Sequence, residues 1–432
     1  MAKCAGCSGG LISVSHSDTN CIHLTGDGTS GSPLVATLQI DPASPAAITC
    51  GASGLSVEGG SSACAQKNMY TVSTVGPTGL GVYLGTAEPF LSCADFIGDG
   101  INDDVAIQTA VTASYSAYNV ALPLPPEIYL NTGIFGLSAS VDVKGAPLRG
   151  AYNTLITNAA TATGFNLLRN PGYMTNLQLG ELLAHLAAAP IVIDTPTGFP
   201  PYFDNVSVAS NGIGVDPGMI FFTISASYRI QNCDIDNNTA TAVIPGIYES
   251  NNSVPLRRIL NNRFVGASID LIEHSGANAQ IRDNIFYGNS TTPVVGDRGM
   301  INILLTGAFT VQHHEISGNH ITDSPGHGIV INGGAGGGQA LRFLIHDNLI
   351  DNYGYTGTNA YDGIFLAGNS DEHDIQGNIC HSTQAGARHG VNVSAVTCND
   401  NFVTNNNLLN SGASASFNDA GTTTISAAGN RL

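Results

Sequence analysis

A six-residue pattern recurs seven times between residues 230 and 408, and it limits the possible folds more than any other feature of the chain. Each copy has an aliphatic residue first, a small polar residue or glycine third, and an apolar residue last. The copies are Ile230–Ile235, Ile259–Phe264, Ile281–Phe286, Ile316–Ile321, Ile345–Ile350, Ile375–Cys380 and Val403–Leu408. Their fourth positions, residues 233, 262, 284, 319, 348, 378 and 406, are separated by 29, 22, 35, 29, 30 and 28 residues. This spacing is typical of the coils of a solenoid, with insertions.

A single coil of this length cannot fold alone. Ordering it costs about 1.5 kcal/mol per residue, whereas each buried aliphatic side chain returns only about 1.5–3 kcal/mol. The coils must therefore stack, and stacking places equivalent residues about 4.8 Å apart. We predict an all-β chain folded as a right-handed parallel β-helix, with apolar columns and a ladder of the six asparagines at the fourth position. The alternative is a β-sandwich with unrelated asparagine-rich turns.

The ends of such a solenoid need covers, because an open coil exposes its apolar interior. Residues 103–114 suit a short amphipathic helix that is capped by Asn102 or Asp103 and covers the first coil. We expect a small β-rich module at 1–90, the capping helix and first strands at 91–150, stacked coils at 151–410, and a carboxyl-terminal cap or tail at 411–432.

Composition excludes several classes of partner. The chain has 432 residues, 52 of them glycine, and a formal net charge of −18. Only three lysines occur, Lys3, Lys67 and Lys144. Nucleic acid is an unsuitable partner for such a surface. We also expect no membrane insertion, since no apolar run is long enough, and the start, MAKCAGCSGG, lacks the apolar core of a secretory signal.

The nine cysteines are spread too thinly for a disulfide framework. Cys4 and Cys7 form a CxxC pair that could bind a metal together with Cys21, but no second pair completes four ligands. The other interpretation is a flexible, thiol-bearing tail. Residues 99–104 lack the closing glutamate of a calcium loop. We expect no required metal and no cofactor.

A second feature repeats once per coil: a variable residue, a glycine and then an apolar strand. Stacking would align Arg298, His327, Asp362 and His389 in one column of four coils. An aspartate between two histidines can hold one of them as a proton acceptor, and Arg298 could neutralise a substrate carboxylate. One carboxylate in the column favours β-elimination on a uronic acid over hydrolysis, which usually needs a pair. Hydrolysis stays an alternative, because Asp323, Asp351 or Glu372 could supply a second carboxylate. The column is equally consistent with a buried polar stack, and strict strand alternation does not decide between them.

The insertion at 352–363 carries Tyr353, Tyr355 and Tyr361. We expect these rings to project beside Asp362 and to stack on sugar, since the chain has no tryptophan. A packed loop or a subunit contact is the alternative. Val330 and Phe365 are expected to be exposed on the same strands, where they would form an apolar surface for oligomerisation.

The stretch DFIGDGINDDVAIQTAV at 95–111 resembles the opening of the pectate-lyase-like superfamily, in which such a turn and a short helix precede the β-helix. With the repeats, the resemblance covers about 95–410, although ALPLPPEIYLNTG at 121–133 is less regular than the usual strand. The resemblance indicates the fold specifically but does not indicate which reaction, if any, the protein catalyses. It implies a phage tail spike or a polysaccharide lyase, hydrolase or epimerase, and members of this superfamily commonly trimerise.

Residues 21–57 resemble the Gly-Asp-Gly-Thr-rich leaders of minor tail proteins from phages of actinobacteria. That resemblance implies that the module joins the chain to other virion tail proteins and that the protein assembles in the host cytoplasm. We therefore expect a phage tail spike or tail-tip protein, a homotrimer, that binds a host surface glycan, with cleavage of that glycan as a second hypothesis. The alternatives are a non-enzymatic structural or adhesion tail fibre and a free bacterial polysaccharide lyase.

Overall fold

The computed structural model describes residues 103–121 and 127–432, apart from 131–132, 152, 159–164, 181–188, 196–199, 211–217, 225, 238–243, 253–255, 274–275, 289–297, 335–336 and 427–428. Before residue 103 it describes only short strands. Four of these form two antiparallel hairpins, β1 (Ile22–Thr25) with β2 (Val35–Leu38) and β3 (Ala46–Gly51) with β4 (Gly54–Gly59). They belong to a unit at Met1–Met69 that is separate from the unit at Tyr70–Leu432. The sequence-based boundary at residue 90 stays a prediction, and Cys4, Cys7 and Cys21 lie outside the described residues.

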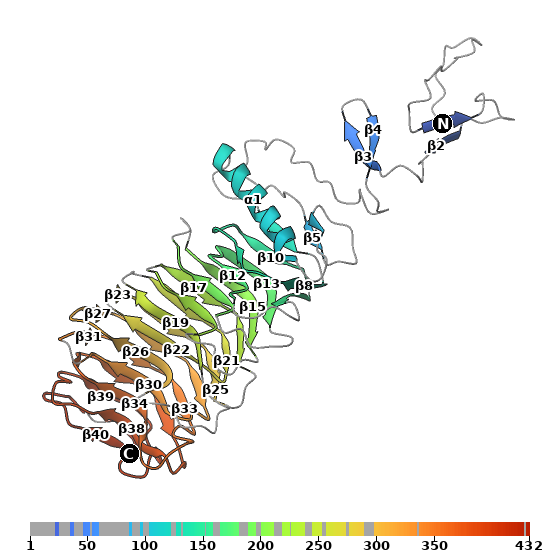
Figure 1. Ribbon diagram of the computed structural model, residues 1–432. Helices are drawn as coiled ribbons and strands as arrows, with labels where there is room; N and C mark the ends of the chain where they lie inside the picture. The colour runs from blue at the N-terminus through green and yellow to red at the C-terminus, as the bar shows by residue number, and fades with distance from the viewer. Residues whose placement is uncertain are drawn as a thin grey trace, which may run out of the picture. The chain divides into compact units, whose positions relative to one another are not determined.

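The second unit is a right-handed parallel β-helix, as the repeat predicts. Figure 1 shows its strands stacked in rows from green to red. One wall is an 11-stranded sheet, called here the front sheet. Its strands are β9 (Val141–Asp142), β12 (Leu168–Arg169), β14 (Ile191–Ile193), β16 (Ile220–Phe222), β19 (Ile244–Asn252), β22 (Ala267–Glu273), β26 (Gly299–Leu305), β30 (His327–Asn332), β34 (Tyr361–Ala367), β38 (Ala387–Val393) and β40 (Phe417–Asp419).

A 21-stranded sheet, called here the back sheet, forms the remaining walls as two arms that meet at a corner. Its strands are β5 (Thr86–Glu88), β6 (Phe96–Ile97), β7 (Ile128–Leu130), β8 (Gly133–Leu137), β10 (Leu148–Gly150), β11 (Thr154–Asn158), β13 (Tyr173–Gly180), β15 (Tyr202–Ser210), β17 (Tyr228–Gln231), β18 (Asp234–Asn237), β20 (Arg257–Leu260), β21 (Arg263–Val265), β24 (Ala279–Arg282), β25 (Ile285–Tyr287), β28 (Glu315–Ser317), β29 (His320–Thr322), β32 (Leu344–His346), β33 (Leu349–Asp351), β36 (Asp374–Gln376), β37 (Ile379–His381) and β39 (Phe402–Thr404). A short four-stranded sheet lies between the two walls, with strands β23 (Gly276–Ala277), β27 (Thr310–Gln312), β31 (Gln339–Leu341) and β35 (Ser370–Asp371).

The first and last positions of the repeat form the predicted apolar columns. The first positions pair in register from coil to coil, in the order Ile230, Ile259, Ile281, Ile316, Ile345, Ile375 and Val403. All seven are fully buried. The stacking prediction is therefore confirmed.

The third position of the repeat is the corner of the back sheet, and it explains the choice of residue there. Residues 232, 261, 283, 318, 347, 377 and 405 all have φ between 54° and 67°. Asparagine, aspartate and glycine tolerate this left-handed conformation better than other residues do. At Gly377 a Cβ would lie 2.7 Å from Oδ1 of Asp347, but this carboxylate is exposed and can move, so the left-handed φ is what favours glycine there.

The fourth position forms the predicted amide ladder. From Asn284 onward, each side-chain oxygen accepts the backbone N–H and the side-chain amide of the asparagine one coil earlier, at 2.9–3.1 Å. At the start of the ladder, Oδ1 of Asn262 accepts the N–H of Cys233. The ladder runs through Asn262, Asn284, Asn319, Asn348, Asn378 and Asn406, and continues to Asn430. Asn430 shows that the segment at 411–432 adds a further coil. Parallel bridges from Phe402 to Ile425 and from Asn407 to Arg431 support the same conclusion.

Helix α1 (Asp103–Ala121) covers the amino-terminal coil and is longer than the predicted 103–114. Ile107 and Val111 are fully buried in the same core as the first coils. The two acidic residues of its first turn also contact the coil. Oδ2 of Asp103 accepts the N–H of Gly136, and Oδ1 of Asp104 accepts the N–H of Ser138, at 2.8 and 2.9 Å. These bonds join the helix to β8.

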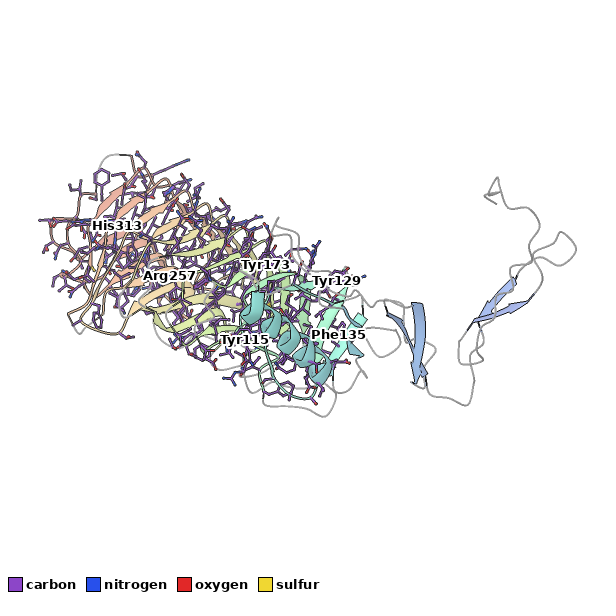
Figure 2. All side chains as sticks on the ribbon, turned by 90° about the horizontal axis from the view of Figure 1, so that it is seen from above. Tyr115, Tyr129, Phe135, Tyr173, Arg257 and His313 are labelled. Atoms are coloured by element: carbon purple, nitrogen blue, oxygen red, sulfur yellow. The ribbon has the colours of Figure 1, made fainter. Side chains whose placement is uncertain are left out.

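The interior of the solenoid also holds an ionic group, called here the interior cluster: Tyr228, Glu249, Arg257 and His314. Glu249 extends inward from the front sheet, where it pairs in register with core residues Phe222 and Leu271. Its carboxylate accepts hydrogen bonds from the Tyr228 hydroxyl and, at 3.1 Å, from Nη1 of Arg257. Nη2 of Arg257 lies 3.3 Å from Nε2 of His314. Figure 2 places Arg257 midway along the stacked coils.

Aromatic residues extend this interior column toward the carboxyl-terminal coils. The ring of His314 stacks on Phe343 at 4.4 Å between centroids, and Phe343 contacts His373 at 4.9 Å. Burial lowers the pKa of His373 to about 3, and the neighbouring His314 acts in the same direction. His373 is therefore neutral, and its Nδ1 accepts the N–H of Phe343 at 3.0 Å.

Candidate functional site

Three of the four residues predicted to share a column lie on successive coils of the front sheet. Asp362 pairs in register with His389. The N–H of Asp362 donates to Nδ1 of His327, at 2.9 Å, across the preceding coil boundary. Arg298 was placed in the column wrongly, because Gly299 is the residue opposite His327. An alignment of Gly299 with Gly328 would place Arg298 beside His327. In the structure the register between β26 and β30 differs from that alignment by one residue.

The glycines that follow the column residues decide which way these side chains face. A Cβ on Gly328 would lie 2.5 Å from Cγ2 of Ile350, and one on Gly363 would lie 2.9 Å from Sγ of Cys380. Both glycines therefore face the core and interrupt the strand alternation. His327 consequently faces outward, where its ring stacks on Phe365 at 4.6 Å between centroids.

The outward face is nevertheless covered, so the expectation that Val330 and Phe365 are exposed is wrong. Their exposed fractions are 0% and 6%, and those of His327 and Asp362 are both 0%. Two side chains provide part of the cover. The guanidinium of Arg388 lies 5.9 Å from the Phe365 ring centroid, and Tyr361 packs edge-on against His327.

Asp362 is the centre of a group called here the outer cluster. His327, Arg388 and Asn392 are hydrogen-bonded to Asp362, and His389 pairs with it in register on the next coil. Arg388 donates to both oxygens of Asp362, from Nε at 3.0 Å and from Nη2 at 2.6 Å. Asn392 donates from Nδ2 to Oδ2 at 3.0 Å. A buried carboxylate with these partners holds the guanidinium in one orientation. Asp362 therefore positions Arg388, whose side chain is 30% exposed.

The two histidines of the outer cluster have different hydrogen-bonding partners. Because Nδ1 of His327 accepts a backbone N–H, its proton is on Nε2 and its lone pair is already used. The His327 ring is therefore neutral, and the 3.5 Å distance between its Nδ1 and Oδ2 of Asp362 does not represent an ion pair. His389 has the opposite tautomer: Nδ1 lies 2.9 Å from the carbonyl of Ala415, which can only accept, so Nε2 carries the lone pair. Of the two, His389 is the possible proton acceptor.

Arg298 belongs to a second arginine–aspartate pair on the same face. Its Nη1 lies 2.8 Å from Oδ2 of Asp270, which is fully buried, while the Arg298 side chain is 43% exposed. Burial raises the pKa of the Asp270 carboxyl, against the opposing effects of Arg298, Asn302 and Ser268. Asn302 and Ser268 donate to its other oxygen at 2.6 and 2.9 Å. Asp270 therefore orients Arg298 as Asp362 orients Arg388.

Only one of the three tyrosines expected to project from the loop at 352–363 does so. Tyr355 is 49% exposed. Tyr353 is fully buried in the core, and its hydroxyl donates to the carbonyl of His389 at 2.9 Å. Tyr361 is 9% exposed and packs on His327. The exposure expected of Tyr353 and Tyr361 is wrong, because the loop folds back on the next coil: a Cβ on Gly354 would lie 2.6 Å from the Ala387 nitrogen.

The sequence interpretation missed Arg388, Asn392, Asp270 and Asn302. A signal for three of them was present, because Asp270, Asn302 and Asn392 each stand between two aliphatic residues of a front-sheet strand. The pairing in the structure puts them in one outward row with Val330 and Phe365. No pattern marks Arg388, which precedes the aligned His389.

Within the described residues, no three His, Cys, Asp or Glu side chains are grouped as metal ligands would be. Cys233, Cys380 and Cys398 are buried free thiols, and burial raises the pKa of Cys233 to about 12. No helix among the residues that can be described is both long and apolar enough to cross a bilayer.

No protein-family model and no curated protein sequence matches the chain. Several solved structures are similar to it. Dettilon tailspike protein is 14% identical with a TM-score of 0.48, over 76% of this chain and 68% of that one. The A-module of an Azotobacter vinelandii mannuronan C-5 epimerase is 16% identical with a TM-score of 0.42, over 78% and 95%. Tailspike protein 2 of the Escherichia coli O157:H7 bacteriophage CAB120 is 14% identical with a TM-score of 0.43, over 81% and 43%.

Proposed function

We propose that this protein is a tail-spike-like virion component whose front sheet binds an acidic cell-surface polysaccharide. One observation carries the proposal: Arg298 and Arg388 are half-exposed on the same face, and each is held by a fully buried aspartate. A guanidinium fixed in this way binds a carboxylate with little loss of side-chain freedom. Uronic acids supply such carboxylates.

The spacing of the two arginines suits an extended polymer. Three coil steps separate β26 from β38, so the two guanidinium groups lie roughly 14 Å apart along the solenoid axis. The exposed ring of Tyr355, on the loop that precedes β34, is available to stack on a sugar. The net charge of −18 disfavours a polyanion at long range, so affinity must come from these local contacts.

Binding should depend on Arg388. The variant R388A/D362N removes the guanidinium without leaving an uncompensated buried carboxylate. We expect its affinity for oligogalacturonate or another uronate oligosaccharide to fall about tenfold or more, because a hydrogen bond to a charged group contributes about 1.5–3 kcal/mol. Isothermal titration calorimetry on the full chain measures this.

The matched control is R263A. Arg263 is also half-exposed and paired with an aspartate, Asp234 at 2.7 Å, but it lies on the back sheet. It should bind acidic oligosaccharides as the wild type does. Unchanged affinity in both R388A/D362N and R298A/D270N would refute the proposal.

A second candidate function is cleavage of the bound polysaccharide by β-elimination, and the tautomer of His389 favours it. In this reaction Nε2 of His389 takes the proton from C5 of a uronate whose carboxylate lies against Arg388. The C4–O bond then breaks, a C4–C5 double bond forms, and the leaving oxygen takes a proton from water to become a hydroxyl, while the His389 imidazolium releases the C5 proton to solvent. His327 cannot take this role, since its lone pair is occupied.

The elimination is detected as an unsaturated uronate chromophore on incubation with host acidic glycans. H389A should lower the rate by about 10²–10⁴-fold, the usual contribution of a general base, while binding is retained. Absence of product with wild-type protein that binds the glycan would leave the non-enzymatic adhesion fibre as the function. Full activity of H389A would exclude His389 as the base.

In this proposal the module at 1–90, which contains the hairpins β1–β2 and β3–β4, joins the chain to other tail proteins. The β-helix would assemble as a homotrimer in the host cytoplasm and act in the virion. Exposed apolar residues on one outward column of the back sheet, Ile285, Leu349 and Ile379, support self-association. Analytical ultracentrifugation of the full chain distinguishes a trimer from a monomer.

A further inference from the structure

A groove lies along the corner of the back sheet in the early coils, away from the two arginines of the front sheet. It has a volume of about 400 Å³, within the range of small-molecule sites. We call it the corner groove. It is lined by Ala151, Asn153, Asn176, Leu177, Gln178, Asn205, Val206, Ser207, Asn232 and Asp234. Four successive coils contribute to it.

The groove exists because of two columns of the solenoid. One is the corner itself, where Asn153, Asn176, Asn205 and Asn232 all have left-handed φ, between 54° and 63°. Each coil therefore presents one asparagine at the same place. The side chains bond along the axis, as Nδ2 of Asn205 does to Oδ1 of Asn176 at 2.8 Å, and this fixes their orientation.

The second column is the first outward position after the corner, where the early coils carry short or polar residues. Gln178, Ser207 and Asp234 pair in register there. The same column carries Leu155 on the coil before Gln178, and in later coils it carries the larger side chains Arg263, Ile285, His320, Leu349 and Ile379. The hydroxymethyl group of Ser207 thus leaves room that the later coils fill. Arg263 closes one end, since its Nη1 reaches back to Asp234 at 2.7 Å.

The chemistry of the lining selects the kind of ligand. Five of the ten residues carry side-chain amides, each of which both donates and accepts, as sugar hydroxyls do. Among the residues that the structure describes, none of those lining the groove is basic, and the lining carboxylate, Asp234, is paired with Arg263. The Arg263 guanidinium at the end of the groove is already paired with Asp234, so it offers little to an anion. An apolar ligand would leave the side-chain amides without hydrogen-bond partners. A neutral, hydroxyl-rich ligand satisfies the lining.

We propose that the corner groove is a second glycan site, specific for a neutral oligosaccharide segment lying along the solenoid axis. Equivalent amides recur about every 4.8 Å in that direction, so a chain of sugars meets the same groups on successive coils. This site lies on the back sheet and in earlier coils, whereas the two arginines lie on the front sheet. It is also expected to bind neutral sugars, whereas the front-sheet site is expected to bind acidic ones.

The test is a glycan array of neutral and acidic oligosaccharides probed with the full chain, followed by calorimetry on the neutral glycans that bind. S207Y fills the groove and should weaken neutral binding about tenfold or more, and Q178A should weaken it several-fold. T322Y introduces the same ring at a partly exposed position of a later coil and should bind as the wild type does. Because R388A/D362N leaves the groove intact, it should also retain neutral binding.

Two results would overturn the inference: no neutral oligosaccharide bound at millimolar concentration, or S207Y and Q178A both binding neutral glycans with wild-type affinity. Q178A keeps the test informative if S207Y fails to fold. Failure of the front-sheet proposal is distinguishable, because it concerns acidic oligosaccharides and is insensitive to S207Y.

Discussion

Replacing Glu249 by leucine is expected to lower the free energy of unfolding by about 3–5 kcal/mol, the usual cost of removing one partner of a buried ion pair. The reason is the position of Arg257, which is fully buried and bonded to Glu249 at 3.1 Å. Without the carboxylate, a guanidinium remains inside the solenoid next to His314. Urea denaturation of the variant and the wild type measures the change, with the same dependence of unfolding free energy on urea concentration in both proteins.

The matched experiment replaces both charges. E249L/R257M should recover much of the lost stability, because well-packed apolar residues can replace a buried ion pair at little cost. The exposed pair Arg342 and Glu372 is the surface control, and E372A should change stability by less than about 1 kcal/mol. If E249L is as mild as E372A, the interior cluster does not stabilise the stack.

The second large effect is expected at the middle of the amide ladder. In N348A the N–H and Nδ2 of Asn319 lose their acceptor and the carbonyl of Ile316 loses its donor, in a buried corner that water does not reach. Nδ2 of Asn319 keeps its bond to the carbonyl of Ile281, so two groups are left unsatisfied. At about 1–3 kcal/mol for each of them, the free energy of unfolding should fall by roughly 2–6 kcal/mol. Urea denaturation again provides the measurement.

Asn430 is the internal control for that prediction. It makes the same contacts at the end of the ladder but is only partly buried, so water can replace its amide. N430A should lower stability by less than N348A does. Equal effects at the two sites would mean that the ladder acts through each local turn and that its burial is unimportant.

The fold could be predicted from the sequence because each repeat position has one physical task. The first position, as in Ile316, fills the core. The third, as in Gly318 with φ of 64°, must adopt a left-handed backbone. The fourth, Asn319, bonds to the next coil. Because each position requires a particular residue type in every coil, the repeat reveals both the length of a coil and the fact that the coils stack.

The candidate site was predictable only in part, because its register depends on segments without a repeat. Alignment of glycines placed His327, Asp362 and His389 correctly on neighbouring coils. The same alignment misplaced Arg298 by one residue, since Gly299 pairs with His327. The 35-residue interval between Asn284 and Asn319 contains the insertion that allows this shift.

Burial was harder to predict than position. Phe365 faces outward, so strand alternation suggests exposure, but Arg388 from the next coil lies over its ring. Arg388 is 23 residues away in sequence and belongs to no repeat. The interior ion pair was missed for a similar reason: Glu249 and Arg257 extend from different walls, and no short pattern connects charges on facing sheets.

The loop between β33 and β34 has a consequence for how such a protein can change. It inserts residues 352–360 between two strands, yet Leu349 still pairs with Ile379 and Ile364 with Val391 on the following coil. Tyr353, Gly354 and Thr356 are buried and tie the loop to neighbouring coils, but its tip at 357–358 is exposed. This tip can lengthen, shorten or exchange its sequence while the scaffold beneath stays the same. With the proposed function, a change of glycan specificity can proceed through such exchanges in a loop, with no need to redesign the core.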